Sequence, residues 1–374
     1  MKRLNRKIRS LLKNIVKLLG FNRFLFWAKT PFVSEKYFAK AEQARIALNQ
    51  FSPCPQGTSV AKNTISSCDY DLQIVIPAYN VEKYIAECID SILKQKTKYS
   101  YKIVVINDGS NDRTEEILGQ YSNDPRIEII HQENRGFSGA RNRGLEKIKA
   151  KYIAFVDSDD KLAPNAIESL LNVAFAQNAD IVEGGFYRLE DKLCLGYKHK
   201  KIEQVDAVRG LKGYPCGKVF RSFLFENIHF PENFWFEDSI GAFLLYPKAE
   251  KAVVIPDIVY VYRNNLTSIT HTAPFKKKCI DTYWVTELLL EEQKQLNIAN
   301  NDGVFEIFLK QVVLNYQRTR KIPMEVQKDV FVCTKELMTR YFERSNPKSF
   351  KALVVALQNN DFGKYACFCR NYIL

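Results

Sequence analysis

The sequence from residue 72 to about residue 186 predicts a doubly wound α/β domain, and two observations carry that prediction. Short runs rich in Ile and Val alternate with segments whose apolar residues have helical spacing. Because these runs are apolar throughout, they indicate strands that are buried on both faces of a mostly parallel sheet. Polar residues follow the strands, and in such sheets ligands bind beyond the carboxyl ends of the strands.

The first half of this region contains three strands and two helices. LQIVIPAY (72–79) is the first strand, and a helical pattern of apolar residues follows over 84–93. KIVVIND (102–108) is the second strand, and RTEEILGQY after it forms a helix for which Asn111 or Asp112 is available as the cap. RIEIIHQ is the third strand.

The second half adds two more strands. Residues 138–148 form a third helix, and YIAFVD (152–157) is the fourth strand. Pro164 opens another helix, which leads to the fifth strand in NADIVEGGF (178–186). Beyond about residue 275 the patterns indicate helices, as in TYWVTELLLEEQKQL and VFEIFLKQVVLNYQRTR.

The first 30 residues predict a basic amphipathic helix. Apolar residues recur at helical spacing from Leu4 to Leu18, and Arg and Lys populate the other faces. Such a helix suits the surface of an anionic bilayer, so we expect residues 1–30 to bind a membrane peripherally. A helix that packs on the body of the protein, with its basic side solvated, is the alternative.

The composition describes a folded cytoplasmic protein that has an anionic partner. Lys plus Arg number 55 against 42 Asp plus Glu, a net charge of +13, which favours nucleic acid, an anionic bilayer or phosphorylated small molecules. No nucleic-acid-binding motif is present, so we expect no nucleic acid. The nine cysteines have no metal-ligand spacing and indicate reduced thiols. Lys13 and Lys17 interrupt what would be a signal peptide's apolar core, and no run approaches the roughly 20 apolar residues of a membrane span.

Three carboxylates occur within four positions after the fourth strand, in AFVDSDDK (154–161). Clustered like charges repel one another and resist burial, so this arrangement requires a counter-charge. Asp157 and Asp159, at i and i+2, suit a hard divalent cation, and Mg²⁺ or Mn²⁺ shares such sites with substrate phosphates. An Asp-rich turn that caps the helix starting near Ala163 is the alternative. The position of the cluster at the ligand-binding edge, beside Asp108, favours the cation.

Six ordered blocks resemble the inverting family-2 glycosyltransferases of the bacterial capsule and surface-polysaccharide type, which have the GT-A fold. The blocks are IVIPAYNVEKYIAECIDSILKQ, IVVINDGSNDRTEEIL, ENRGFSGARNRGL, YIAFVDSDD, WFEDSIGAFLL and VYVYRNNLTSITH. The resemblance covers roughly half the chain. It implies transfer of a sugar from a nucleotide diphosphate donor, often a UDP-sugar, usually with Mn²⁺ or Mg²⁺.

The resemblance also implies a division of the chain. Residues 71–272 would form the GT-A domain, with a nucleotide-sugar half at 71–186 and an acceptor half at 187–272. Residues 1–70 would be the basic N-terminal extension and linker, and residues 273–374 a C-terminal helical region.

Carried over by position, the resemblance implies a nucleotide site at the strand ends. Pro77, Ala78 and Tyr79 would border the nucleobase, and Asp108 would accept a hydrogen bond from uracil.

Further residues would hold the ribose and the diphosphate. Asn134 and Arg141 would help to seat the base, ribose or phosphates. Asp157 would face the ribose, and Asp159 would hold the metal ion that bridges the diphosphate.

The segment YRNNLTSITH resembles the part of the family that closes over the diphosphate. Arg263, Ser268 and His271 would contact the donor there, and His271 would also ligate the metal. A surface ion pair is the alternative for Arg263, and an ordinary loop residue is the alternative for His271.

Glu237 and Asp238 resemble the family's acidic pair, and Asp238 would be the general base. The acceptor hydroxyl has a pKa far above 7, so its attack requires proton removal in the transition state. A helix cap before Ser239 is the alternative for Asp238. One base and direct displacement predict inversion at the anomeric carbon. Lys218 in CGKVFRS is a weaker candidate for contact with an anionic acceptor.

The expected function is transfer of a hexosyl or N-acetylhexosaminyl group to a growing surface glycan or a lipid-linked acceptor. A nucleotidyltransferase that makes activated sugars is an alternative, although it would need a Gly- and Arg-rich loop where IPAYNVEKY has no glycine. The missing G-x-G-x-x-G also excludes a dinucleotide-dependent oxidoreductase. A non-catalytic relative that binds glycan or nucleotide is a further alternative.

Overall fold

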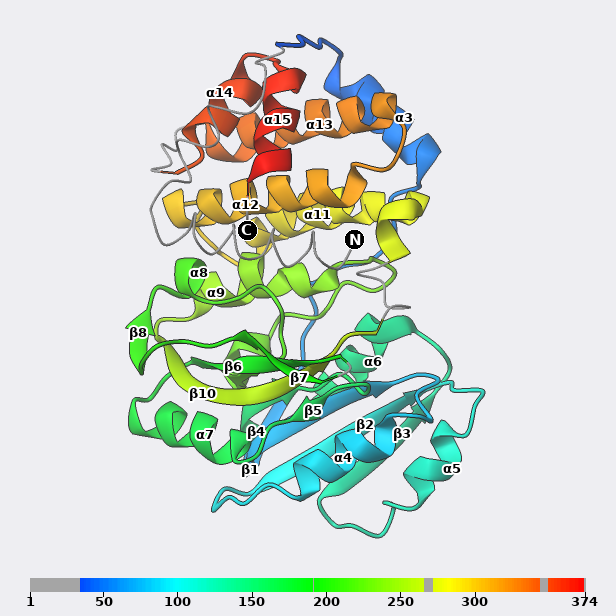
Figure 1. Cartoon of the computed structure of the whole chain (residues 1–374), viewed down its shortest axis with the longest axis vertical. Coiled ribbons are helices and arrows are strands. Elements are labelled where there is room, and N and C mark those ends of the chain that lie inside the picture. The colour runs from blue at the N-terminus through cyan, green and yellow to red at the C-terminus, as the bar shows by residue number, and fades with distance from the viewer. Residues whose placement is uncertain (1–33, 191, 266–271, 344–348, 373–374) are drawn as a thin grey trace.

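The structure is a computed structural model that describes residues 34–190, 192–265, 272–343 and 349–372. A twisted sheet with helices on both faces forms one half of the molecule, and a layered unit of helices lies beyond it (Figure 1). The predicted mostly parallel α/β domain and the predicted C-terminal helical region are both confirmed.

Within the described residues, a ten-stranded sheet has its strands in the order β3-β2-β1-β4-β9-β6-β10-β5, with β7 paired to β6 and β8 to β10. The strands are β1 (Thr64–Ala78), β2 (Tyr101–Asp108), β3 (Ile127–Gln132), β4 (Lys147–Phe155), β5 (Lys161–Leu162), β6 (Ile181–Leu189), β7 (Leu193–Tyr197), β8 (Glu203–Val205), β9 (Lys218–Arg221) and β10 (Ala252–Arg263). β1 to β4 are mutually parallel, as are β6 and β10, and β9 lies antiparallel between β4 and β6.

Alternate residues of the central strand β1 serve two separate cores, because successive side chains on a strand point to opposite faces. The helices that cover the sheet are α4 (Ile85–Leu93), α5 (Thr114–Gly119), α6 (Gly136–Leu145) and α7 (Ala166–Ala176). Ile74 and Ile76 belong to the core that contains the buried faces of α4, α5 and α7. Val75 belongs to the other core, which contains α6 and the C-terminal helices. Burial on both faces explains why the strands are apolar throughout.

Several element boundaries differ from the prediction, and two of these differences change how the chain is divided into elements. The third helix ends at Leu145 rather than at residue 148, because 147–152 alternate between exposed and buried positions and begin β4. The stretch 1–70, predicted as an extension and linker, contains α3 (Ala41–Phe51) and the start of β1, which begins at Thr64.

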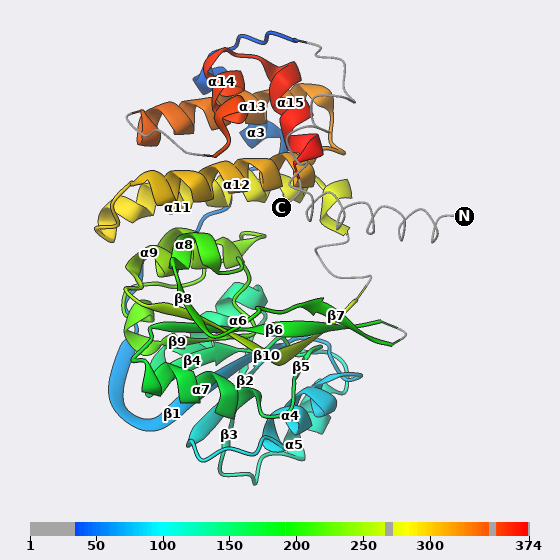
Figure 2. The same cartoon turned by 60° about the vertical axis from the view of Figure 1, so that its left-hand side comes forward.

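The helical unit consists of two layers. Its C-terminal members are α11 (Asp281–Gln295), α12 (Asp302–Thr319), α13 (Met324–Phe342), α14 (Lys351–Gln358) and α15 (Phe362–Asn371). α11 and α12 lie next to the sheet domain, while α13 to α15 and the N-terminal helix α3 form the outer layer (Figures 1 and 2). Arg45 of α3 binds both carboxylate oxygens of Glu287 on α11, at 3.2 and 2.9 Å.

The segment between α3 and β1 is fixed to both halves of the molecule. The Thr58 hydroxyl and the Ser59 N–H donate to the Glu292 carboxylate on α11. Asn63 Nδ2 donates to the carbonyl of Ile228 in the sheet domain at 3.2 Å.

No helix among the described residues has the length and apolarity needed to cross a bilayer. The predicted membrane-binding helix at 1–30 lies outside the described residues. All nine cysteines are free thiols.

Gly144 is where helix α6 makes its closest approach to the sheet, and Gly144→Ala should therefore destabilise the fold. A Cβ atom there would lie 2.5 Å from Val75 Cγ1 and 3.1 Å from Ile106 Cδ1. Such overpacking costs about 1–3 kcal/mol. Urea denaturation is the measurement. Gly119→Ala is the control, because a Cβ there meets no atom within 4 Å; equal unfolding free energies for the two variants would contradict the prediction.

Candidate active site

The predicted nucleotide residues meet at the carboxyl ends of β1 and β2. Pro77 and Ala78 end β1, and the parallel register places Ala78 beside Asn107, one residue before Asp108. Tyr79 follows the strand with 47% of its surface exposed, so its ring is open to a ligand. The sheet therefore brings these side chains to one edge, as the strand pattern predicts.

Asp108 is buried, and the loop after β3 holds it in place. Its Oδ1 accepts hydrogen bonds from Gln132 Nε2 at 2.6 Å and from the Arg135 N–H at 2.9 Å. Asn134 Nδ2 donates to the Asp108 carbonyl at 2.9 Å, so these two predicted residues lie together. Asp108 Oδ2 has no hydrogen-bond partner in the described part of the chain, which leaves it available to accept an N–H from a ligand.

Arg141 links the aspartate cluster to the acidic pair. It lies on α6 and is buried, with Nη2 donating to Asp157 Oδ1 at 2.8 Å and Nη1 donating to Glu237 Oε1. Burial alone lowers the pKa of Arg141, but the charges of Asp157 and Glu237 outweigh that effect, and the net shift is upward. Arg141 therefore stays charged and organises two carboxylates. Both of its terminal nitrogens are engaged by carboxylates.

The protein itself supplies part of the counter-charge that the sequence analysis assigned to a cation. Asp157 is paired with Arg141 and also accepts the Cys216 thiol at 3.4 Å. Asp160 is buried and accepts the Tyr260 hydroxyl at 2.8 Å and the Arg263 N–H at 2.7 Å. Burial, followed by the charge of Asp157, raises the pKa of Asp160 to about 8. Among the described residues, the third carboxylate of the cluster is the one that accepts no hydrogen bond shorter than 3.4 Å.

That third carboxylate, Asp159, is partly exposed and fits a divalent cation. Its one hydrogen bond to a described residue is a long one, 3.4 Å from Asn265 Nδ2. Mg²⁺ and Mn²⁺ often bind one or two carboxylates and take their remaining ligands from phosphates and water. Within the described residues no group of three His, Cys, Asp or Glu side chains is arranged to hold a metal alone. Donor phosphates, water and the predicted ligand His271, which lies outside the described residues, are the groups left to complete the site. Burial and the neighbouring charge of Asp157 raise the pKa of Asp159.

Arg263 forms the ion pair that was the alternative interpretation. Its Nη2 contacts Glu87 Oε2, its Nε donates to the Asp159 carbonyl at 2.8 Å, and its guanidinium lies 4.8 Å from the centre of the Tyr84 ring. Arg263 thus lies beside the aspartate cluster, but a carboxylate already pairs with it. Ser268 and His271 lie outside the described residues.

Asp238 and Glu237 begin a short irregular helix after β9. η3 (Glu237–Ser239) is a 3₁₀ turn, and η4 (Gly241–Leu245) after it is one turn of π-helix, a feature frequent at functional sites. Phe236 precedes them with φ of +65°, so the chain turns sharply just before the acidic pair.

The two members of this pair have different environments. Glu237 is buried against Arg141; burial raises its pKa, and the guanidinium opposes that rise. Asp238 is partly exposed and accepts no hydrogen bond from the described residues, so the capping alternative is not observed. Burial raises the pKa of Asp238, the charges of Arg318 and Arg141 oppose it, and Asp157 adds to it. Within the described part of the chain, the oxygens of Asp238 are therefore available to accept a proton.

Sequence reasoning missed Arg318, Tyr260 and Cys216. Tyr260 donates to Asp160 and accepts the Asp157 N–H at 3.1 Å, so it fixes the loop that carries the aspartates. Cys216 stands two residues before Lys218, at the start of the segment CGKVFRS. Arg318 lies on α12, in a helical pattern with nothing in its spacing to indicate a role.

The prediction that Lys218 contacts an anionic acceptor needs correction. Its ammonium is fully buried, 2.8 Å from Glu183 Oε2, and donates to the Tyr214 carbonyl at 2.7 Å. His199 Nε2 lies 2.8 Å from the other oxygen of Glu183. Because Lys218 is an interior residue that is already paired, it cannot reach an acceptor in this structure.

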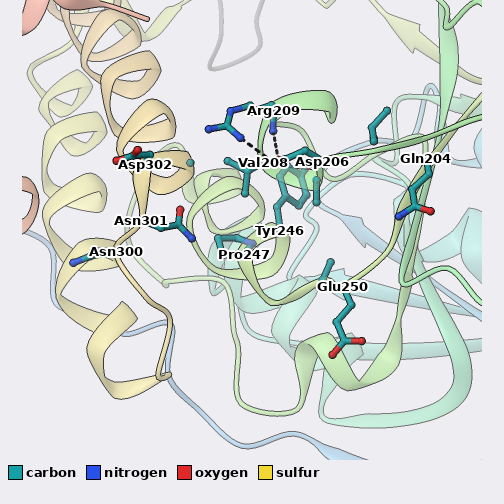
Figure 3. Close-up of a pocket in the computed structure, with 14 residues that line it drawn as sticks. Gln204, Asp206, Val208, Arg209, Tyr246, Pro247, Glu250, Asn300, Asn301 and Asp302 are labelled. Carbon is teal, nitrogen blue, oxygen red and sulfur yellow. Dashed lines mark hydrogen bonds and ion pairs between the residues drawn. The ribbon is translucent and has the colours of Figure 1, made fainter. Parts of the chain in front are cut away.

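A cavity of about 1000 Å³ lies away from these residues (Figure 3). It is bounded by β8, α8 (Ala207–Gly210), α9 (Tyr246–Lys248) and the turn before α12. β8 pairs with the first residues of β10, whereas Arg263 is the last residue of β10. The cavity therefore opens at the opposite edge of the sheet, and Arg209 in it is already paired with Asp206 and Glu306.

Comparison with known proteins identifies the class. A family model described as "Glycosyl transferase family 2" matches residues 73–231. "Uncharacterized glycosyltransferase EpsJ" of Bacillus subtilis is 36% identical over 246 residues, covering 61% of this chain and 69% of that protein. The chain therefore belongs to glycosyltransferase family 2.

Two further proteins are similar to this chain, one in sequence and one in fold. "Minor teichoic acid biosynthesis protein GgaB" of Bacillus subtilis is 27% identical over 265 residues, covering 67% of this chain but 29% of that protein. The crystal structure of residues 1–349 of S. aureus TarS, in complex with UDP-GlcNAc, has a TM-score of 0.65 with 20% identity and covers 79% of this chain and 89% of that one. At this identity the TarS match shows the GT-A fold alone.

Proposed function

We propose that the protein transfers a sugar from a UDP-sugar to a hydroxyl group of a growing surface glycan or a lipid-linked acceptor, with inversion at the anomeric carbon. The observation that carries the proposal is the Arg141 bridge. It ties Asp157, beside the donor-side strands, to Glu237, the neighbour of Asp238, through one buried guanidinium. A donor-side aspartate cluster and a free carboxylate base therefore belong to one site.

On the donor side, the residues offer a complementary surface for a uridine nucleotide. Asp108 Oδ2 is available to accept the uracil N–H, and the exposed Tyr79 ring is available to stack on the base. A relative with this fold is described in complex with UDP-GlcNAc, which supports UDP as the carrier. Asp159 would hold a divalent cation, which when bound neutralises charge on the leaving diphosphate.

On the acceptor side, Asp238 accepts the proton of the attacking hydroxyl. Its carboxylate oxygens have no hydrogen-bond donor in the described residues, so no described donor occupies the lone pair that would accept the proton. Because a single base serves a direct displacement, the sugar leaves with inverted configuration. Glu237 holds Arg141 and does not share this role, since its own carboxylate is buried in the ion pair.

The proposal also covers the chemical class of the acceptor and the place in the cell where transfer occurs. GgaB is named for teichoic acid biosynthesis, which supports a cell-surface polymer as the acceptor. Residues 1–30 would bind the cytosolic face of the membrane, where a lipid-linked acceptor would be available.

Asp159→Asn should remove metal-dependent donor turnover. We expect the wild type to release nucleotide slowly from one member of a panel of UDP-, GDP-, CMP- and dTDP-sugars, with Mn²⁺ or Mg²⁺ and not with EDTA. The substitution removes the one open carboxylate of the cluster, so the rate should fall about 100-fold. Nucleotide release by chromatography is the measurement.

Asp257→Asn is the matched control, because Asp257 is an exposed aspartate on β10 whose carboxylate accepts only the Ser169 hydroxyl among the described residues. If nucleotide release does not depend on metal and Asp159→Asn leaves its rate unchanged, Asp159 does not hold a catalytic metal ion. Formation of pyrophosphate from UTP and a sugar phosphate would instead support a nucleotidyltransferase.

A further inference from the structure

A cation from the C-terminal helical unit lies beside the proposed catalytic base. Arg318 is near the C-terminal end of α12, and its guanidinium lies 3.9 Å from the centre of the Phe236 ring. Its Nη1 donates to Thr282 Oγ1 on α11 at 2.9 Å. Phe236 is two residues before Asp238, so α11 and α12 hold this guanidinium against the turn that carries the base.

Arg318 has no carboxylate within ion-pair distance in the described part of the chain. Its side chain is partly buried, and burial lowers its pKa, which the charges of Asp238 and Glu237 oppose. Partly burying a cation without a close partner is costly. Glu237 already pairs with Arg141, so Asp238 is the carboxylate left to balance the charge of Arg318.

We propose that Arg318 is a positioning residue for sugar transfer, which acts from the helical unit to keep Asp238 ionised and correctly placed to accept the acceptor's proton. This inference rests on the proposed role of Asp238 as the base. It gives the C-terminal helices a part in catalysis in addition to packing. Nothing in the family resemblance extends to α12, which begins after the last matching block.

Several other charged groups also influence the pKa of Asp238. The charged and titratable groups that interact electrostatically with Asp238 are Glu237, Arg141 of α6, Asp157 after β4, Tyr246 of α9 and Arg318. From α11, Asp281 faces the preceding turn, but it pairs with Lys278 at 2.7 Å and accepts the Trp235 N–H.

These charges determine the direction in which the pKa of Asp238 changes when Arg318 is removed. Burial raises the pKa of Asp238, and Arg318 is the strongest influence that opposes the rise. Removing Arg318 therefore shifts the pKa of Asp238 further upward. A base must be deprotonated to act, so the acidic limb of the rate profile should move to higher pH.

The test compares Arg318→Met and Arg318→Lys with the wild type in the full-length protein. The pH dependence of kcat/KM for donor turnover is measured on the donor that the panel identifies. We expect Arg318→Met to move the acidic limb up by about one pH unit, which lowers kcat/KM about tenfold at pH values on that limb. The affinity for UDP should stay unchanged, because Arg318 lies on the acceptor side. Arg318→Lys should restore most of the pH limb but not the full kcat/KM, since lysine keeps the charge and loses the planar contact with Phe236.

Arg320→Met is the control, because Arg320 is an exposed arginine two residues further along. An independent readout is the titration of ¹³C-labelled aspartate carboxyls, with the Asp238 signal assigned by its loss in Asp238→Asn. An upward shift of the Asp238 pKa in Arg318→Met, together with the displaced limb, supports the proposal.

Two results would overturn it. If Arg318→Met leaves the Asp238 titration and the acidic limb of the rate profile unchanged and lowers only the thermal stability, Arg318 is a packing residue. A raised KM for the acceptor with an unshifted limb would make it an acceptor-binding residue instead. If the wild type turns over no sugar donor, the proposed function fails, and Arg318 then has no reaction to support even where the titration shifts.

Discussion

Asp238→Asn is expected to lower kcat for sugar transfer by about 10²–10⁴-fold, the range that a positioned general base contributes. The amide has nearly the shape of the carboxylate but cannot accept the proton of the acceptor hydroxyl. Asp238 accepts no hydrogen bond from the described residues, so the replacement breaks no contact of the fold. Unfolding free energy and affinity for UDP should therefore stay close to those of the wild type. Initial rates of transfer and calorimetric binding of UDP measure the two effects.

Asp302→Asn gives the comparison for this experiment, because Asp302 is exposed at the start of α12 and takes no part in the candidate site. Transfer by Asp238→Asn within a few fold of the Asp302→Asn rate would show that another group removes the proton. Loss of UDP binding in Asp238→Asn would instead place this residue on the donor side.

Arg141→Met should produce the largest loss of stability among single changes in the site. It leaves Glu237 buried and Asp157 partly buried, each without its cation, and breaking such a buried pair costs about 3–5 kcal/mol. Without the guanidinium that opposes the effect of burial, the pKa of Glu237 rises further in the folded state, so the folded variant binds a proton more readily than the unfolded chain. The loss should consequently shrink as the pH falls from 8 to 5. Urea denaturation across that range is the measurement.

Two comparisons separate the ion pair from ordinary packing. Arg135→Met removes an arginine that is half exposed and paired with Glu232 at 2.7 Å, and it should cost less than about 1 kcal/mol. Adding Glu237→Gln to Arg141→Met should recover part of the loss, because the uncompensated charge is then absent. A loss for Arg141→Met that is small and independent of pH would contradict the ion-pair assignment.

The placement of the candidate donor residues at one edge of the sheet was predictable from sequence, because these residues follow the ends of strands. Apolar runs define the strands, parallel pairing brings their ends to one edge, and the residues that follow, such as Asp108 and Asp157, must gather there. The same logic could not predict how the charges pair. Asp157 is balanced by Arg141, which stands 16 residues earlier on a helix, and only the packing of α6 on the sheet shows that contact.

The acceptor side was less predictable, because its contacts join segments that are distant in sequence. Lys218 is a single cation in a segment that resembles the family, which suggests contact with an acceptor. The fold instead buries it against Glu183 on the neighbouring strand. Arg318 looked like one of many helical arginines, yet it meets the turn at Phe236. Pairings of this kind depend on tertiary packing, and neither hydrophobic period nor local composition carries that information.

The path of the chain through the helical unit has a consequence for synthesis in the cell. α3 precedes the sheet in sequence but packs with helices that follow it, and Cys333 of α13 contacts the carbonyl of Ala41 across 292 residues. At about 5–20 residues per second, a ribosome needs roughly 15–60 s to make that stretch. During this interval the sheet domain can form, while the apolar face of α3 lacks the C-terminal helices that it packs against. We therefore expect a nascent chain to bind its nucleotide before it can transfer sugar, because α12 and Arg318 leave the ribosome only near the end.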